Sequence, residues 1–306
     1  MKFMKEDQKR QNIVRGVRRF GHFLDHLVII AVILLLLLGL YALWDSRQVY
    51  VDASARQYEV YRPGDRDGLG FEQLREGNRD VIAWICEYGT GIDYPVVRGE
   101  DNFEYLNKSA KGTYSLAGAI FMDYRNHADF SDTATTLYGH HMSYGVMFGD
   151  IDQFSKEGFL ESHRYGSLYD GSKTYGLENF AYIETDAYDS EVYREGVSAA
   201  QLPSYVETLR KKAMQTMPVE VREGDRIVLL STCATGYTDA RQIVAAKISD
   251  QVQGNTFPDQ HAKTGILPLD FTHAGEWHQV PIPLLVLLWI LLILVIVWTV
   301  FRKRKK

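Results

Sequence analysis

The sequence predicts a mainly β domain, a barrel or a sandwich, that is held to a membrane at both ends of the chain. Over residues 71–250, short runs rich in Val, Ile, Phe and Tyr alternate with turn residues, which is typical of strands in such folds. Each end of the chain carries an apolar stretch of 18 residues, about the length that crosses a ~30 Å hydrocarbon core.

The two apolar stretches predict a two-pass membrane topology. The first, 27–44, follows the basic segment 1–26, and the second, 284–301, precedes the basic tail 302–306. The positive-inside rule places both basic ends in the cytoplasm. A cleaved signal peptide is the alternative for the first stretch, but the Tyr-Ala-Leu-Trp at its end offers no small-residue cleavage pattern. We therefore expect an extracytoplasmic body between two membrane helices.

The body divides into three parts with different compositions. A polar stalk is expected over 45–70, a folded domain over 71–250, and a Gly- and Pro-containing linker over 251–283. The segment between the two membrane helices holds 22 basic and 36 acidic residues. Such an acidic body argues against nucleic acid as a partner.

Within the domain, the apolar pattern predicts a set of strands and two short helices. The strands are expected at 81–86, 92–97, 117–123, 135–138, 179–185, 226–230 and 242–248. A short helix is expected over 71–76, and an amphipathic helix over 203–214 has Pro203 in its first turn. Many strands with few interposed helices favour one barrel-like or sandwich domain.

The chain has two cysteines, Cys86 and Cys233, in a compartment that permits disulfides. A disulfide between them is the alternative to two free thiols. Cys86 lies in an apolar run, where a free cysteine commonly acts as a small buried hydrophobe. That interpretation leaves Cys233 as a free thiol outside the cytoplasm, which calls for a chemical reason.

Cys233 follows an apolar strand and precedes a Gly/Thr/Asp-rich turn. Arg241 follows this turn, at the start of the next apolar run. If the two strands pair, the thiol and the guanidinium come within side-chain reach, and a cationic neighbour makes a thiol reactive near neutral pH. Arg241 could instead form a surface ion pair with Asp239. Its planar fork of donors also suits a developing oxyanion.

A cysteine nucleophile needs a proton-transfer partner, and His140 is the candidate. It follows Leu-Tyr-Gly at an expected strand end, although a structural histidine is the alternative. Adjacent His141 would point to the opposite face of an extended backbone, so we interpret it as structural. No zinc-ligand spacing accompanies the pair. We expect neither a metal nor another cofactor.

Several motifs together resemble the sortase family, and in particular its class B. Leu230-Ser-Thr-Cys233 with Arg241 eight residues on, and Tyr138-Gly-His140 upstream, resemble the sortase signature, although Leu229 stands where the commonest form has threonine. Further class B-like segments are Asn78–Ile85, Ile92–Val97, Asp101-Asn102, Tyr105-Leu106, Gly118–Asp123, Tyr138–Met142, Met147–Asp150 and the helix at 203–214. The resemblance covers roughly 71–250.

This resemblance implies an eight-stranded sortase-type β-barrel with N-terminal helices and a cysteine transpeptidase activity. Carried over by position, Cys233 is the nucleophile, His140 the general acid/base and Arg241 the stabiliser of the oxyanion or substrate. Ser231 and Thr232 would shape the acyl pocket. The implied partners are secreted proteins with a C-terminal sorting signal, cleaved after threonine, and an amine acceptor, which is a peptidoglycan precursor or a pilin lysine.

The second membrane stretch departs from the class B pattern, in which a single N-terminal anchor is typical. A C-terminal anchor is more familiar in pilus-building sortases, so a pilin polymerase is kept as the alternative to cell-wall anchoring. An apolar stretch with a basic end also has the shape of a sorting signal, but Leu267-Pro-Leu-Asp-Phe271 lacks the Thr-Gly. A cysteine peptidase and a non-catalytic surface scaffold are the remaining alternatives.

Overall fold

The computed structural model describes residues 2–64, 70–233 and 239–257, together with Trp289 and Ile293. The described residues divide between two compact units, one that contains 2–47 and another that contains 48–64, 70–233 and 239–257. The predicted second membrane helix, 284–301, lies outside the described residues except for Trp289 and Ile293.

The N-terminal apolar stretch belongs to one long helix, α1, which runs over Lys2–Ala53. Its segment Arg10–Ala42 is long and apolar enough to cross a membrane. The helix extends beyond the predicted span 27–44 in both directions, because the flanking basic and polar residues are themselves compatible with helix.

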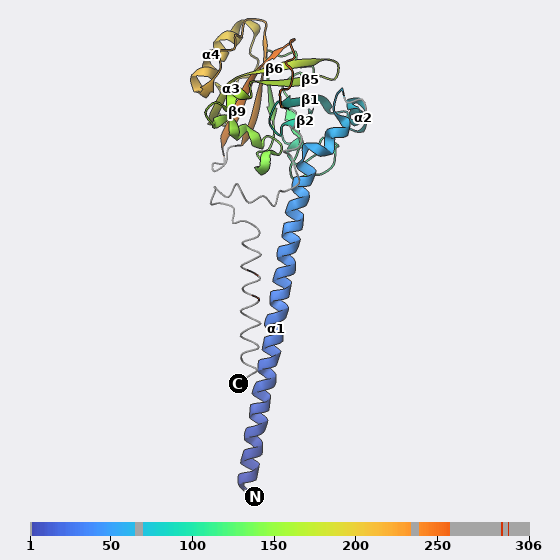
Figure 1. Cartoon of the computed structure of the whole chain (residues 1–306), viewed down its shortest axis with the longest axis vertical. Helices are drawn as coiled ribbons and strands as arrows, with labels where there is room; N and C mark the ends of the chain where they lie inside the picture. The colour runs from blue at the N-terminus through green and yellow to red at the C-terminus, as the bar shows by residue number, and fades with distance from the viewer. Residues whose placement is uncertain (1, 65–69, 234–238, 258–288, 290–292, 294–306) are drawn as a thin grey trace. The chain divides into compact units, whose positions relative to one another are not determined.

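Among the described residues, nine strands form one sheet, and eight of them close into a barrel (Figure 1). The strands are β1 Val81–Glu87, β2 Asp93–Val97, β3 Ile120–Met122, β4 Ala134–Tyr138, β5 Tyr165–Tyr169, β6 Thr174–Asp186, β7 Ala213–Thr216, β8 Arg226–Cys233 and β9 Ala240–Ser249. The ring order is β5-β1-β2-β3-β4-β8-β9-β6, and pairing of β5 with β6 closes it. The predicted eight-stranded barrel is thus confirmed, with short β7 added on β6.

Short helices precede the first strand and lie between later strands. They are η1 Ala55–Tyr61, α2 Phe71–Gly77, η2 Glu104–Leu106, η3 Ser143–Gly145, η4 Gly149–Ser155, α3 Phe159–Ser162, η5 Ala199–Gln201 and α4 Leu202–Lys212. The predicted helix 203–214 was too long at its end, because Ala213 adopts extended backbone and pairs with Ile183 of β6. Met214 consequently belongs to β7.

Strand β8 is buried on both faces, which explains its continuous apolar run. Val228 and Leu230 belong to the core cluster inside the barrel. Ile227 and Leu229 point the other way, into a second cluster that β6, β8 and β9 form with α4 on the outer side of the sheet. Figure 1 shows α4 beside the barrel strands. The strand that ends at Cys233 is therefore fixed by packing from both sides.

Part of the segment that we predicted as a stalk contributes to the barrel core. Ala53, Ala55 and Tyr58 are buried in the same hydrophobic cluster as residues of β1 and β2. Arg62 pairs with Asp93 of β2, whose other carboxylate oxygen accepts a 2.6 Å hydrogen bond from the Trp84 indole. These contacts hold the residues after α1 to β1 and β2.

Candidate active site

Three strand ends bring the predicted site residues to one edge of the barrel. Strands β4 and β8 run parallel, with Tyr138 opposite Ser231. The backbone amide of Gly139 donates to the Ser231 carbonyl over 3.2 Å, and His140 is the next residue. On the other side, the antiparallel β8–β9 pair places Cys233 opposite Arg241. The register therefore gathers His140, Cys233 and Arg241 at the same end of three neighbouring strands.

Cys233 is the last residue of β8, and its side chain lies outside the described part of the structure, as do residues 234–238. The predicted pairing of its strand with that of Arg241 is present over the full length of β8. The other cysteine, Cys86, lies half-buried in β1.

His140 is oriented by a backbone carbonyl. Its Nε2 atom lies 2.9 Å from the carbonyl oxygen of Leu106, the last residue of η2. A carbonyl can only accept, so Nε2 carries the proton, and the lone pair of the neutral ring resides on Nδ1. The ring is half-buried, so Nδ1 is the atom suited to exchange a proton with a bound molecule.

Arg241 is the first residue of β9 that pairs with β8. Its Nη1 atom donates a 3.0 Å hydrogen bond to the carbonyl oxygen of Ala240, and the side chain is half-buried. Its other strand neighbour is Thr185 of β6. Arg241 thus lies between β8 and β6, at the edge where Cys233 ends its strand.

Ser231 and Thr232 lie on opposite faces of β8. Ser231 is 1% exposed, and its Oγ atom lies 2.7 Å from the hydroxyl of Tyr193. Thr232 continues the interior face of Val228 and Leu230 and is 2% exposed. Of the two predicted pocket residues, only Ser231 faces the segment that precedes α4.

A carboxylate network that the sequence analysis missed lies beside β4. Asp123 accepts hydrogen bonds from the Arg125 guanidinium at 2.6 and 2.8 Å, from the Tyr138 hydroxyl at 3.0 Å and from the Asn102 amide at 3.2 Å. Burial disfavours its charge, but the bonds from Arg125 outweigh burial and lower the pKa of Asp123. The Asp-Tyr-Arg spacing after β3 is the only sequence signal of this network.

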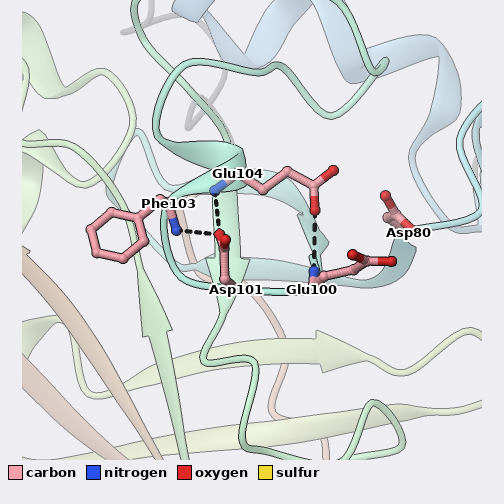
Figure 2. A pocket seen from close by; sticks show the side chains of 5 residues that line it. All are labelled: Asp80, Glu100, Asp101, Phe103 and Glu104. Atoms are coloured by element: carbon pink, nitrogen blue, oxygen red, sulfur yellow. Dashed lines mark hydrogen bonds between the residues drawn. The ribbon is translucent and has the colours of Figure 1, made fainter.

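An acidic depression lies at the other end of η2. Figure 2 shows its lining, which consists of Asp80, Glu100, Asp101, Phe103 and Glu104. Asp101 accepts from the backbone amides of Phe103 and Glu104 at 2.8 and 2.9 Å, and Glu104 accepts from the amide of Glu100 at 3.1 Å. Glu104 also pairs with Lys108 at 2.7 Å, and the Tyr105 hydroxyl donates to Asp80 at 2.6 Å, so the carboxylates have partners within the fold. The lining of the depression contains no thiol or imidazole.

A closed eight-stranded barrel with a cysteine, a histidine and an arginine at adjoining strand ends defines a sortase-type fold and site. The sortase domain family matches residues 88–249. Sortase B of Listeria monocytogenes is 34% identical over 185 residues, which are 60% of this chain and 74% of that protein.

Two solved structures are similar over the same region. Sortase B from the type II pilus of Streptococcus pneumoniae is 43% identical, with a TM-score of 0.52, and the match covers 60% of this chain and 99% of that one. A class B sortase of Streptococcus pyogenes involved in pilus biogenesis is 38% identical, with a TM-score of 0.55, and the match covers 60% and 100%. The chain belongs to the sortase family and is a class B sortase.

Proposed function

We propose that this chain is a membrane-anchored transpeptidase that cleaves a sorting signal after threonine and transfers the acyl group to an amine. The observation that carries this proposal is the register of β4, β8 and β9, which gathers His140, Cys233 and Arg241 at one edge of a class B sortase barrel.

The proposed reaction passes through a thioester on Cys233. The thiolate attacks the threonine carbonyl carbon, and the resulting oxyanion is stabilised by the Arg241 guanidinium. Protonated His140 donates the Nδ1 proton to the leaving amine as the peptide bond breaks. An incoming amine then attacks the thioester, loses a proton to Nδ1, and releases Cys233 as the thiolate. The Leu106 carbonyl keeps Nε2–H engaged, so one ring nitrogen performs both proton transfers.

Membrane anchoring supports this reaction by raising the effective concentration of a membrane-tethered substrate. The apolar part of α1, Arg10–Ala42, supplies the N-terminal anchor. We propose that 284–301 is a second anchor and that both basic ends are cytoplasmic, because this topology places the barrel on the outer face with the secreted proteins.

Two acceptors fit the proposed chemistry. Transfer to a peptidoglycan precursor would anchor surface proteins to the cell wall. Polymerisation of pilin subunits is the second candidate, and it is favoured by the 43% and 38% identities to two class B sortases associated with pili.

The test uses the full chain in detergent micelles with a pool of peptides, each holding one threonine at a fixed position among degenerate residues. We expect cleavage after threonine and more amide product as triglycine is added. Cys233→Ala should abolish both products, and Cys86→Ala should retain them. Cleavage whose product ignores triglycine would instead identify a cysteine peptidase. Unchanged surface display in cells carrying Cys233→Ala would indicate a non-catalytic scaffold.

A further inference from the structure

Four aromatic rings form a ladder that leads from the barrel core to the segment after β9. The members of this aromatic ladder are Phe154 of η4, Phe159 of α3, His163 at the end of α3, and Phe257. Phe154 is fully buried, and the Phe159 ring lies edge-on against it with centroids 5.0 Å apart. The His163 ring is stacked with Phe159 at 3.7 Å and with Phe257 at 4.9 Å. Phe257 thus joins the segment after β9 to the core.

Phe257 is the point at which the predicted linker, 251–283, turns inward. Residues 251–256 are exposed in succession, whereas Phe257 is half-buried. Its backbone amide donates a 2.8 Å hydrogen bond to the side-chain oxygen of Asn255, which is typical of a tight turn. Because a stacked aromatic ring contributes more than its buried area alone, this residue is suited to hold an otherwise exposed segment.

The β1–β2 turn, residues 88–92, makes room for the outer rings of the aromatic ladder. Gly89 of this turn has a φ of +81°, in the left-handed region. A Cβ atom at Gly89 would lie 2.7 Å from the His163 ring and 3.0 Å from the Phe257 ring. Glycine therefore supplies both the backbone conformation and the space that the two rings need at this position.

The same turn also contacts the loop that meets the end of α1. The Gly91 amide donates a 2.6 Å hydrogen bond to Asp150, and a Cβ atom at Gly91 would lie 2.3 Å from the Gly145 carbonyl oxygen. Gly145 follows Tyr144, whose ring lies edge-on to that of Tyr50 in the last turn of α1, with centroids 5.6 Å apart. The turn 88–92 is therefore joined to the end of α1 as well as to Phe257.

We propose that Phe257 is a docking residue that holds the linker on the aromatic ladder, so that the linker leaves the barrel on the side where α1 meets it. Docking fixes 251–257 and leaves only 258–283 to reach the second apolar stretch. Both ends of the barrel unit are then held at one turn, as two anchors in one membrane require. This membrane consequence rests on the proposed second anchor, whereas the docking of Phe257 does not.

Distances between two spin labels on the full chain in detergent micelles test the docking without any substrate. Cys86→Ala and Cys233→Ala remove the native thiols, and Val51→Cys and Gly254→Cys carry the labels. Val51 of α1 is 44% exposed, and a Cβ atom at Gly254 would have no neighbour among the described residues within 4 Å. Pulsed electron paramagnetic resonance should then give one narrow distance distribution for this labelled parent.

Variants of Phe257 in the labelled parent test whether the ring holds the linker. Phe257→Ala should raise the ratio of undocked to docked linker by about 10-fold, because the burial and stacking of a phenyl ring are lost. Phe257→Tyr keeps the flat ring and should stay within about 2-fold of the parent. Phe103→Ala is the matched control, since Phe103 is 76% exposed. A broad distribution in the parent, or no difference between Phe257→Ala and Phe103→Ala, would overturn the proposal.

The second anchor is tested separately, in intact cells. Lys306→Cys in the background without native thiols should not react with a membrane-impermeant maleimide, because the basic tail is expected in the cytoplasm. Reaction of this cysteine would overturn the two-anchor topology and the membrane consequence, while a narrow distance distribution would still support the docking of Phe257.

Discussion

Cys233 and Arg241 lie directly opposite each other in the antiparallel β8–β9 pair. Arg241 follows Cys233 by eight positions along the chain, yet the register makes them strand neighbours. It also places Arg241 between the cysteine strand and β6, where Thr185 is its other neighbour.

Arg241→Lys tests whether the guanidinium fork is needed beyond its charge. Lysine keeps the positive charge but offers a single ammonium in place of the planar fork. Loss of an oxyanion donor typically costs about 10²- to 10³-fold, so we expect kcat to fall by at least about 10-fold. Steady-state cleavage kinetics measure this. Arg222→Lys is the matched control, because Arg222 is 72% exposed and pairs with Glu220 on the surface. Equal activity of both variants would contradict an oxyanion role.

His140→Gln tests the proton-transfer role. Glutamine can still donate to the Leu106 carbonyl but cannot carry the transferred proton. We expect kcat/KM to fall by about 10²- to 10⁴-fold, as is typical for loss of a general acid/base. His127→Gln, which changes an exposed histidine paired with Asp132, should remain within about 2-fold of wild type, since surface pairs contribute little. A His140 variant that retains most of its activity would rule out this role.

Tyr138→Phe tests the contribution of the Asp123 network to stability. The substitution keeps the ring that packs on Phe121 but removes the hydroxyl that donates to Asp123 over 3.0 Å. We expect a loss of about 1 to 2 kcal/mol in the free energy of unfolding, because the acceptor is charged and buried. Chemical denaturation measures it. Tyr114→Phe, at a residue that is 76% exposed, should change stability by no more than about 0.5 kcal/mol.

Glu87 is expected to make stability depend on pH below neutrality. Burial raises the pKa of this carboxyl from 4.5 to about 7, although a hydrogen bond from Asn179 partly offsets the rise. At pH values below the ordinary pKa, Glu87 is protonated in both the folded and the unfolded state. As the pH rises toward 7, only the unfolded state releases the proton, so the free energy of unfolding falls by on the order of 3 kcal/mol.

Glu87→Gln removes the titrating carboxyl, and with it this pH-dependent part of the free energy of unfolding. The variant keeps a side-chain oxygen that can accept from Asn179. The difference in melting temperature between wild type and the variant should grow, in favour of the variant, as the pH rises from about 4.5 to 7. Thermal unfolding at a series of pH values measures it. Parallel curves for the two proteins would show that Glu87 does not titrate in this range.

The sequence was sufficient where a pattern is local. The apolar run before Cys233 predicts a buried strand because packing on both faces of β8 requires apolar residues at four successive positions, 227–230. The sequence pattern did not predict strands β5 and β7. Strand β5 contains Gly166, which lies opposite Glu87 and leaves room for that buried side chain. Strand β7 begins with Ala213 and Met214, good helix formers that became extended through pairing with β6.

Only the site residues that follow strand-like runs could be predicted from the sequence. Cys233, His140 and Arg241 follow strand-like runs, so their convergence could be inferred from motif spacing and the family resemblance. Tyr193 could not be found in this way. It lies five residues from Tyr188 in the same polar segment, and nothing in the sequence separates the two. In the structure Tyr193 is half-buried, with its hydroxyl 2.7 Å from the Oγ atom of Ser231, whereas Tyr188 is 83% exposed.

The most direct test of the central claim is mass spectrometry of full-length protein in micelles after mixing with the threonine-containing peptide pool and rapid acid quenching. We predict an acyl adduct on the peptide that contains Cys233, linked through its threonine carbonyl. Hydroxylamine should remove the adduct, and Cys86 should carry none. Cleavage of the peptides without any adduct on Cys233, or with the adduct on another residue, would contradict the account.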